Sequence, residues 1–369
     1  MLSEPAQTAM LGPASPRLDI DLNAVRRNFR RMRELAPGAA PWPVVKANAY
    51  GIGARAVVDV LRREGAQAFF VATLDEANAL KDAAGGLPIY LLNGLPAGTA
   101  RDVATAGARP VINSRVQLRE WLTVAKDRPC ALQIDTGINR TGMPPAEFAA
   151  ALAAGEIGAL RLELFLSHLA CADEPDHPMN EAQLARFVSH AAHLPGVRLS
   201  LSASAGALLP QRFHFDVLRP GVGLYGGNPL VGRANPFEPV LRLSAPILQL
   251  RDIVSGESVG YGATFVARRP TRIATIAVGY ADGVPRALSN KGEAIVDGTR
   301  APYAGRVSMD LITLDVTDVP ACVVGSTAEL LGPLYTVDDM AAAAGTPAYE
   351  VLNRLGWRYQ RVWHGGETP

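Results

Sequence analysis

The feature that most limits the possible folds of this chain is a regular alternation of short apolar runs with amphipathic segments. Between most of the runs the apolar residues have helical spacing, as in Leu184, Phe187, Val188 and Ala191. The eight runs, rich in Val, Ile, Leu or Phe, are residues 44–46, 69–72, 89–92, 109–112, 131–134, 162–166, 198–202 and 216–218.

Nearly continuous apolar strands that alternate with helices indicate parallel pairing, with both faces of the sheet covered. Eight such units over this length fit an α/β fold of the closed (β/α)8, TIM-type barrel class. An open doubly wound sheet is the alternative, and periodicity alone does not exclude it. A short strand at residues 18–21 and an amphipathic helix, with Leu22, Val25, Phe29 and Met32 on one face, precede the barrel.

The pattern changes near residue 235. Residues 241–331 alternate apolar and polar positions between Gly or Pro turns, which predicts a mainly antiparallel β domain. The tail returns to helix, with Thr336 as the N-cap of a helix over 337–344 and Pro347 opening a second. We therefore predict a barrel domain over 17–235 and a β domain over 236–369, with residues 1–16 packing against the β domain.

Composition excludes several classes of protein. The chain has 36 Lys plus Arg against 35 Asp plus Glu, so its net charge of +1 gives no broad field for nucleic acid or a membrane surface. Residues 1–16 lack the pattern of a secretory signal. The three cysteines, Cys130, Cys171 and Cys322, are widely spaced and lack a metal-binding pattern. We expect a cytoplasmic protein with reduced cysteines, no metal and a small-molecule ligand.

Residues that could take part in binding or catalysis follow the predicted barrel strands, where barrel enzymes place their active sites. Lys46 closes the first strand, and an amine at the edge of a dry pocket can form an imine with an aldehyde. The others follow the fifth to eighth strands: Asp135, Asn139 and Arg140, then His168, then Ser204, then Arg219 and Gly221.

Two loops suit a phosphate group. Residues 202–206 and 219–226 are rich in Ser and Gly and follow the last two strands, where barrels often bind phosphate. Ser204 would offer its hydroxyl, and Gly221 and Val222 would offer backbone amides.

Several motifs together resemble one family. The segment Val-Val-Lys-Ala-Asn-Ala-Tyr-Gly at residues 44–51 resembles the pyridoxal-phosphate lysine segment of bacterial alanine racemases, which are fold type III enzymes. The other matching motifs follow in family order at 133–142, 167–173, 219–226, 259–264, 278–283 and 305–310.

The resemblance implies interconversion of L- and D-alanine by two-base proton transfer on a pyridoxal 5'-phosphate aldimine, supplying or consuming D-alanine, a cell-wall precursor. Lys46 would hold the cofactor and act as one base, and Tyr261 would be the second base on the opposite face. A free phenol has a pKa of about 10, so neighbouring groups must stabilise the phenolate of Tyr261. His168 would be one of these groups. In the family this tyrosine comes from the partner subunit of a head-to-tail homodimer.

The resemblance also implies binding roles. Arg219 would donate to the pyridine nitrogen and keep it unprotonated, because arginine has donors only. The remaining cofactor contacts would come from Tyr50, His168, Ser204, Gly221, Val222 and Trp357. The substrate would contact Arg140, Met309 and Tyr280, and Tyr280 would lie at the entrance. Asp310 and Gln133 would orient these groups. Asp135 caps its own turn in this interpretation.

Four residues depart from the family pattern. Gln133 stands where many relatives have a carbamylated lysine, so a negative charge beside Arg140 is absent. Trp357 replaces a tyrosine that contacts phosphate. The indole N–H of Trp357 can donate a hydrogen bond, but it cannot accept one. Ile52 replaces a usual histidine, and Ala203 replaces a usual asparagine.

Other functions stay open. Racemases of serine or of several small amino acids are the nearest alternative, and side-chain scope depends on the space around Tyr280, Met309 and Tyr349. A fold type III decarboxylase would place an acid, not Arg219, at the pyridine nitrogen. A non-catalytic single-barrel cofactor-binding protein would not need the second domain.

Overall fold

The computed structural model describes residues 15–366 and divides them into two compact units. The barrel unit comprises Val25–Leu224 and Asn228–Glu238, and the β unit comprises the described residues up to Ala24, Tyr225–Gly227 and those from Pro239 onward. The predicted packing of residues 1–16 concerns a segment that lies almost wholly outside the described residues. The predicted boundary between residues 235 and 236 stays a prediction.

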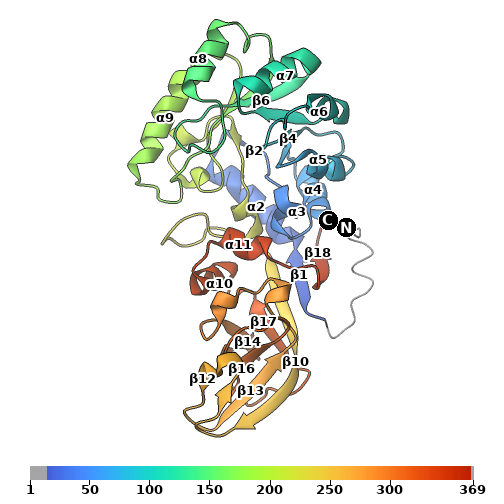
Figure 1. The fold of residues 1–369 in the computed structure, drawn as a ribbon, viewed down its shortest axis with the longest axis vertical. Coiled ribbons are helices and arrows are strands. Elements are labelled where there is room, and N and C mark those ends of the chain that lie inside the picture. The colour runs from blue at the N-terminus through green and yellow to red at the C-terminus, as the bar shows by residue number, and fades with distance from the viewer. Residues whose placement is uncertain (1–14, 367–369) are drawn as a thin grey trace. The chain divides into compact units, whose positions relative to one another are not determined.

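The barrel unit alternates strands and helices, and helices α5 to α9 surround the strands (Figure 1). Its strands are β2 (Ala40–Pro41), β3 (Phe69–Val71), β4 (Ile89–Leu91), β5 (Arg109–Ile112), β6 (Pro129–Gln133), β7 (Arg161–Leu166), β8 (Arg198–Ser200) and β9 (Val217–Leu218). Its helices are α2 (Leu22–Leu35, starting in the β unit), α3 (Lys46–Tyr50), α4 (Ala54–Arg63), α5 (Leu74–Leu80), α6 (Ala100–Ala106), α7 (Arg115–Ala125), α8 (Pro145–Ala153) and α9 (Pro178–Ala191).

The strands of the barrel unit form a closed parallel ring. β3 to β8 pair in chain order, and β2 pairs with β9. Backbone bonds join the two sheets on both sides, from Val45 N to Phe70 O at 2.8 Å and from Arg219 N to Ser202 O at 2.9 Å. The predicted (β/α)8 barrel is therefore confirmed, and the open sheet is excluded.

The first barrel strand differs from the prediction. It lies at Ala40–Pro41, with Val44 in an isolated bridge to Phe70, and Lys46 begins α3 instead of ending the strand. Pro41 and Pro43 have no N–H group, so the ladder along this segment is interrupted. The apolar run was correctly placed in the barrel wall, but its regular part ends before Lys46.

Helix α9 also differs, in the face that it buries. Leu184 and Phe187 are buried as predicted, whereas Val188 is exposed. Asn180 and Gln183 are buried instead. The buried face of α9 therefore includes these two polar residues and leaves out Val188.

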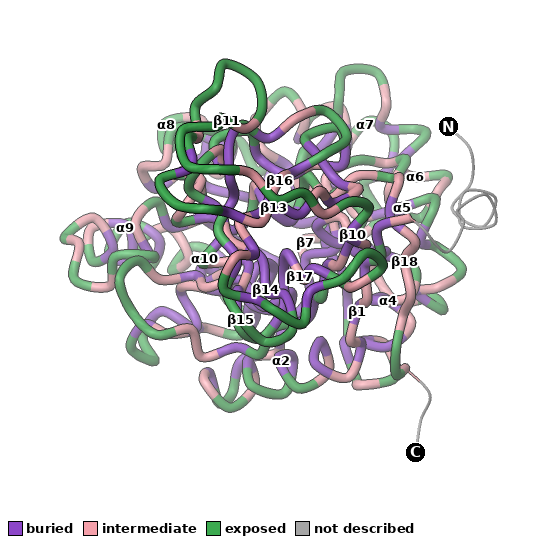
Figure 2. Tube along the Cα trace, turned by 90° about the horizontal axis from the view of Figure 1, so that it is seen from below, coloured by how far each residue is buried: buried purple, intermediate pink, exposed green. Residues whose placement is uncertain are grey.

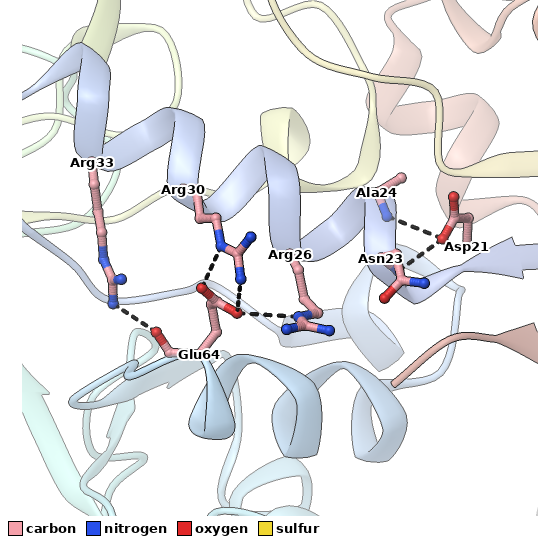
Figure 3. Close-up of polar contacts among 7 residues, drawn as sticks. All are labelled: Asp21, Asn23, Ala24, Arg26, Arg30, Arg33 and Glu64. Atoms are coloured by element: carbon pink, nitrogen blue, oxygen red, sulfur yellow. Dashed lines mark hydrogen bonds and ion pairs between the residues drawn. The ribbon is translucent and has the colours of Figure 1, made fainter. Parts of the chain in front are cut away.

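Helix α2 follows its predicted pattern, since Leu22, Val25, Phe29 and Met32 are all buried. Its polar face is held to the end of α4 by Glu64, whose carboxylate accepts from Arg26 at 3.1 Å and Arg30 at 2.6 Å (Figure 3). Arg33 donates to the carbonyl oxygen of the same residue at 2.9 Å. One acidic residue thus connects three turns of α2 to α4.

The β unit is mainly antiparallel, as predicted. The long strand β10 pairs antiparallel with β1, β13 and β17, while β1 and β18 are parallel. Its elements are β1 (Arg17–Asp21), β10 (Leu241–Ile253), β11 (Ser258–Val259), β12 (Phe265–Val266), β13 (Thr271–Ile276), β14 (Glu293–Val296), β15 (Thr299–Pro302), β16 (Ile312–Asp315), β17 (Thr327–Leu331), α10 (Val337–Ala344), α11 (Ala348–Asn353) and β18 (Gln360–His364). Buried residues gather along strands such as β14 and β17 (Figure 2).

The helical tail of the β unit agrees with the sequence. Thr336 caps α10 and accepts from Asp339 N at 3.2 Å, and the carboxylate of Asp339 accepts from Thr336 N at 2.7 Å. Pro347 is the N-cap of α11. Among the described residues, none of the helices combines the length and apolar character needed to cross a bilayer.

Candidate functional site

Lys46 is followed by a strained turn. Ala47, Asn48, Ala49 and Tyr50 all have left-handed backbone angles, with φ between 51° and 56°. Each such residue costs ~1–2 kcal/mol if it is not glycine. Strain of this kind persists only where surrounding contacts hold it, and it is concentrated at functional sites.

The environment of Lys46 makes the proton of its ammonium group easier to lose. Burial lowers the pKa of this half-buried side chain, the positive charge of Arg140 lowers it further, and the carboxylate of Glu76 opposes the shift. A neutral amine is both the nucleophile for an aldehyde and a competent base. The direction of this shift therefore agrees with the role predicted for this lysine.

The buried Arg219 lies beside His168, which is half-buried. Arg219 is 3% exposed and donates to Ser200 Oγ and Ser167 O, and its Nη2 lies 3.5 Å from His168 Nδ1. The hydrogen-bond partners described for Arg219 are all neutral. Such a buried cation suits a further group that only accepts hydrogen bonds, such as an unprotonated ring nitrogen.

His168 is held in its neutral form. Burial lowers its pKa to about 3, and the charges of Arg219, Arg140 and Lys46 contribute to the shift. A neutral imidazole can accept at one nitrogen and donate at the other. It therefore does not add a charge to the site near neutral pH.

The expected phosphate-binding residues lie together. Ser204 Oγ accepts from Gly221 N at 2.9 Å and from Gly223 N at 3.3 Å. A Cβ placed on Gly221 would lie 2.4 Å from Tyr50 Oη, so the phenol reaches the backbone of this loop only because residue 221 is glycine. Two hydroxyls and the amides around Gly221, with Val222 beside it, form a small polar cradle that suits a phosphate.

The loop after β6 is held by its own side chains. Asp135 Oδ1 accepts from Gly137 N at 2.8 Å and Asn139 N at 3.3 Å, which confirms that Asp135 caps its own turn. Gln133 Nε2 donates to the carbonyl and hydroxyl oxygens of Thr141 at 2.9 and 3.2 Å. Gln133 is thus bonded to the residue that follows Arg140, and the Arg140 side chain is exposed.

Two other departures from the family pattern have plain structural settings. Ile52 is completely buried, so it serves as a packing residue. Ala203 forms a parallel bridge with Arg219 through the backbone, which does not depend on its side chain.

The remaining predicted residues lie in the β unit and are exposed. Tyr261 is 72% exposed in the loop between β11 and β12, and Trp357 is 64% exposed. Tyr280 and Met309 lie on two loops joined by backbone bonds, from Tyr280 N to Ser308 O and from Ala281 N to Met309 O, each 3.0 Å. Within this unit the residue predicted at the entrance and the residue whose amide is predicted to bind the carboxylate therefore lie on adjoining loops.

Asp282 and Arg358 organise these loops, and sequence reasoning missed both. Asp282 is 2% exposed, and its carboxylate accepts two bonds from Arg358 at 2.7 and 2.8 Å. Arg358 also donates to Asp310 at 2.7 Å, which agrees with the orienting role expected for Asp310. The Tyr-Ala-Asp-Gly sequence at 280–283 signals a capped turn around Asp282, but no pattern marked Arg358.

Comparisons with known proteins agree over the length of the chain. Family models described as the N-terminal and C-terminal domains of alanine racemase match residues 20–229 and 240–363. An alanine racemase of Rhodospirillum rubrum is 45% identical, with 95% of this chain and 96% of the relative covered. A catabolic alanine racemase of Agrobacterium fabrum is 44% identical, with coverage of 95% and 93%.

The fold is also that of a solved relative. The crystal structure of alanine racemase from Bartonella henselae, with covalently bound pyridoxal phosphate, superposes with a TM-score of 0.91 at 36% identity. The superposition covers 95% of this chain and all of the relative.

Proposed function

Because the chain belongs to the alanine racemase family, we propose that it interconverts L- and D-alanine with pyridoxal phosphate held in the barrel unit. The observation that supports this most directly is Lys46, a lysine of lowered pKa that begins α3 two residues after the Val44 bridge in the barrel wall. The same barrel unit contains the buried Arg219 and the cradle around Gly221.

The residues present fit this cofactor. The cradle contains Tyr50, Ser204 and the amides of Gly221 and Val222, which would hold the phosphate, with the indole N–H of Trp357 as a further donor. His168 would pack beside the ring, and Arg219 would donate to the ring nitrogen. When bound, pyridoxal phosphate supplies an electron sink that makes the Cα proton of an attached amino acid removable.

Lys46 and Tyr261 are the proposed bases. The Lys46 amine, whose pKa is lowered chiefly by burial, would take or return the Cα proton on one face. Tyr261 would do the same on the other face, since inversion needs a proton to leave one side and arrive on the opposite one.

Arg219 would direct the outcome of the reaction. A guanidinium only donates and holds its protons firmly, so it cannot protonate the ring nitrogen as an acid would. By leaving that nitrogen unprotonated, Arg219 would disfavour proton return at the wrong carbon and so favour racemisation over transamination.

Three residues would recognise the substrate. Arg140 and the Met309 amide would bind the carboxylate, and Tyr280 would limit access to small side chains. Gln133 would support the Arg140 loop through Thr141, and Asp310 would fix the Met309 loop through Arg358.

We further propose that Tyr261 acts in a site of a second copy of the chain, in a head-to-tail homodimer with two composite sites. The support is its high exposure in the β unit, which leaves the phenol available to a partner. The proposed setting is the cytoplasm, where the enzyme would supply or consume D-alanine for the cell wall.

The test is chiral analysis of the purified protein with L-alanine, L-serine or L-lysine in deuterated water. Alanine should racemise fastest and gain deuterium at Cα. Lys46→Ala should abolish the yellow colour and turnover, and Tyr261→Phe should keep the colour while slowing turnover by ~10²–10⁴-fold. Equal rates for Tyr261→Phe and wild type would refute the two-base assignment, and faster turnover of serine would reassign the substrate.

A further inference from the structure

The left-handed turn after Lys46 is tied to a different element by one carboxylate. Glu76, in the first turn of α5, accepts a hydrogen bond from Ala47 N at 2.6 Å through Oε1. Ala47 directly follows Lys46, so this bond fixes the peptide plane between the two residues. The direction in which the Lys46 side chain leaves the backbone depends on that plane.

The other oxygen of Glu76 is anchored in the barrel wall. Oε2 accepts from Ala72 N at 2.7 Å and Thr73 N at 3.3 Å, at the junction of β3 and α5. Thr73 Oγ1 in turn accepts from Glu76 N at 3.3 Å and completes a capping box. A glutamate in a capping box ordinarily serves only its own helix, whereas this one also reaches the segment that carries the lysine.

The turn needs such an anchor. Its internal bonds, among them Gly51 N to Ala47 O at 2.9 Å and Ala54 N to Asn48 Oδ1 at 2.7 Å, join residues that are close in the sequence. Four successive left-handed residues other than glycine persist only where neighbouring structure holds them. A bond from the barrel wall to the first of the four supplies that restraint.

We propose that Glu76 is a positioning residue that holds the left-handed turn and thereby aims the Lys46 amine. This inference rests on the proposed function, because it assigns Lys46 as the cofactor-binding amine. Glu76 also lies close enough for its charge to oppose the loss of the Lys46 proton. The substitution Glu76→Gln separates the effect of the hydrogen bond from the effect of the charge, because glutamine keeps one acceptor oxygen and loses the charge.

The experiment compares Glu76→Ala, Glu76→Gln and Thr73→Ala with wild type. Thr73→Ala is the matched control, since it removes the capping hydroxyl and leaves the carboxylate on Ala47. Amide hydrogen exchange of residues 46–54 in cofactor-free protein reports on the turn. Borohydride fixation of pyridoxal phosphate on Lys46, followed by mass spectrometry, reports on the amine.

Glu76→Ala should speed exchange in the turn and slow fixation on the order of 10²-fold, the cost of a misplaced reactive group. Glu76→Gln should fall between Glu76→Ala and wild type in both measurements, and Thr73→Ala should stay near wild type. Exchange and fixation in Glu76→Ala equal to those of Thr73→Ala would overturn the inference. If wild-type Lys46 is not modified at all, the proposed function fails, while the exchange data still decide whether Glu76 holds the turn.

Discussion

At the scale of single residues, the electrostatics of the barrel site follow from burial and from an excess of positive charge. Lys46, Arg140 and Arg219 are the cations that act on His168, and each of them disfavours a further proton there. The site is thus arranged to receive anionic groups, such as the phosphate and carboxylate of the proposed ligands, and to keep His168 neutral.

His168 should make the protein sensitive to acid. Its pKa is lowered to about 3 from the ordinary 6.5, so between these values the unfolded chain binds more protons and the free energy of unfolding falls as the pH falls. One proton gives a slope of at most about 1.4 kcal/mol per pH unit. His168→Gln should flatten the urea-unfolding profile between pH 6.5 and 4, and His193→Gln, at an exposed position, should not.

Prediction from the sequence worked best for residues whose position along a strand fixes their place. Lys46, His168, Ser204 and Arg219 follow barrel strands, and the ring brings those ends to one side. Glu76 and Arg358 could not be found in this way, because their roles depend on contacts with residues far away in the chain, 76 positions in the pair of Arg358 with Asp282.

At the scale of elements, the sequence placed helices and strands well where a periodic pattern existed. The turn after Lys46 had no such signal, since only Asn48 among its four left-handed residues has a known tendency toward that conformation. The rotated face of α9 was missed because burial of Gln183 depends on its polar partners, among them His168 O at 2.9 Å, and not on apolar spacing.

The ion-pair cluster between α2 and α4 should contribute measurably to stability. The side chain of Glu64 is only 11% exposed, and the hydrogen bond from Arg30 lowers its pKa. Its contribution is therefore present above about pH 4.5, the ordinary value, and is lost as the pH falls below it. Glu64→Gln should lower the free energy of unfolding at pH 7 by about 1–3 kcal/mol.

The matched control is Glu34→Gln, which breaks an exposed pair with Arg31 at 3.0 Å on the same helix. Its cost should stay below about 0.5 kcal/mol. Equal costs for the two variants in urea denaturation would show that the Glu64 cluster adds nothing beyond an ordinary surface pair.

The turn at Tyr280 should tolerate no side chain at Gly283. This residue has φ of 99°, and a Cβ there would lie 1.8 Å from Arg354 O. Gly298 has φ of 73° with nothing within 4 Å, so Gly298→Ala should cost only the ~1–2 kcal/mol of a left-handed alanine. Gly283→Ala should cost at least about 3 kcal/mol, and similar melting temperatures for the two variants would contradict the close approach.

At the scale of the whole molecule, the proposed bases lie in different compact units of one chain. Lys46 begins α3, just after the first strand of the barrel, and Tyr261 lies in an exposed loop of the β unit. The order of a barrel followed by an antiparallel β unit was predictable from periodicity. The expectation that two copies form a composite site came only from the resemblance, because no pattern within one chain encodes its partner.

Subunit mixing tests that assembly. Lys46→Ala and Tyr261→Phe proteins, each impaired alone, are refolded together in equal amounts. With composite sites, half of the dimers contain one chain of each kind, and each of these has one site with both defects and one intact site. Activity should therefore return to about a quarter of the wild-type value. If both bases came from the same chain, every site in the mixture would lack one of them and activity would not rise above that of the separate variants. A chain that stays monomeric in ultracentrifugation would likewise exclude the composite site, so the two measurements together decide whether Tyr261 serves its own chain or its partner.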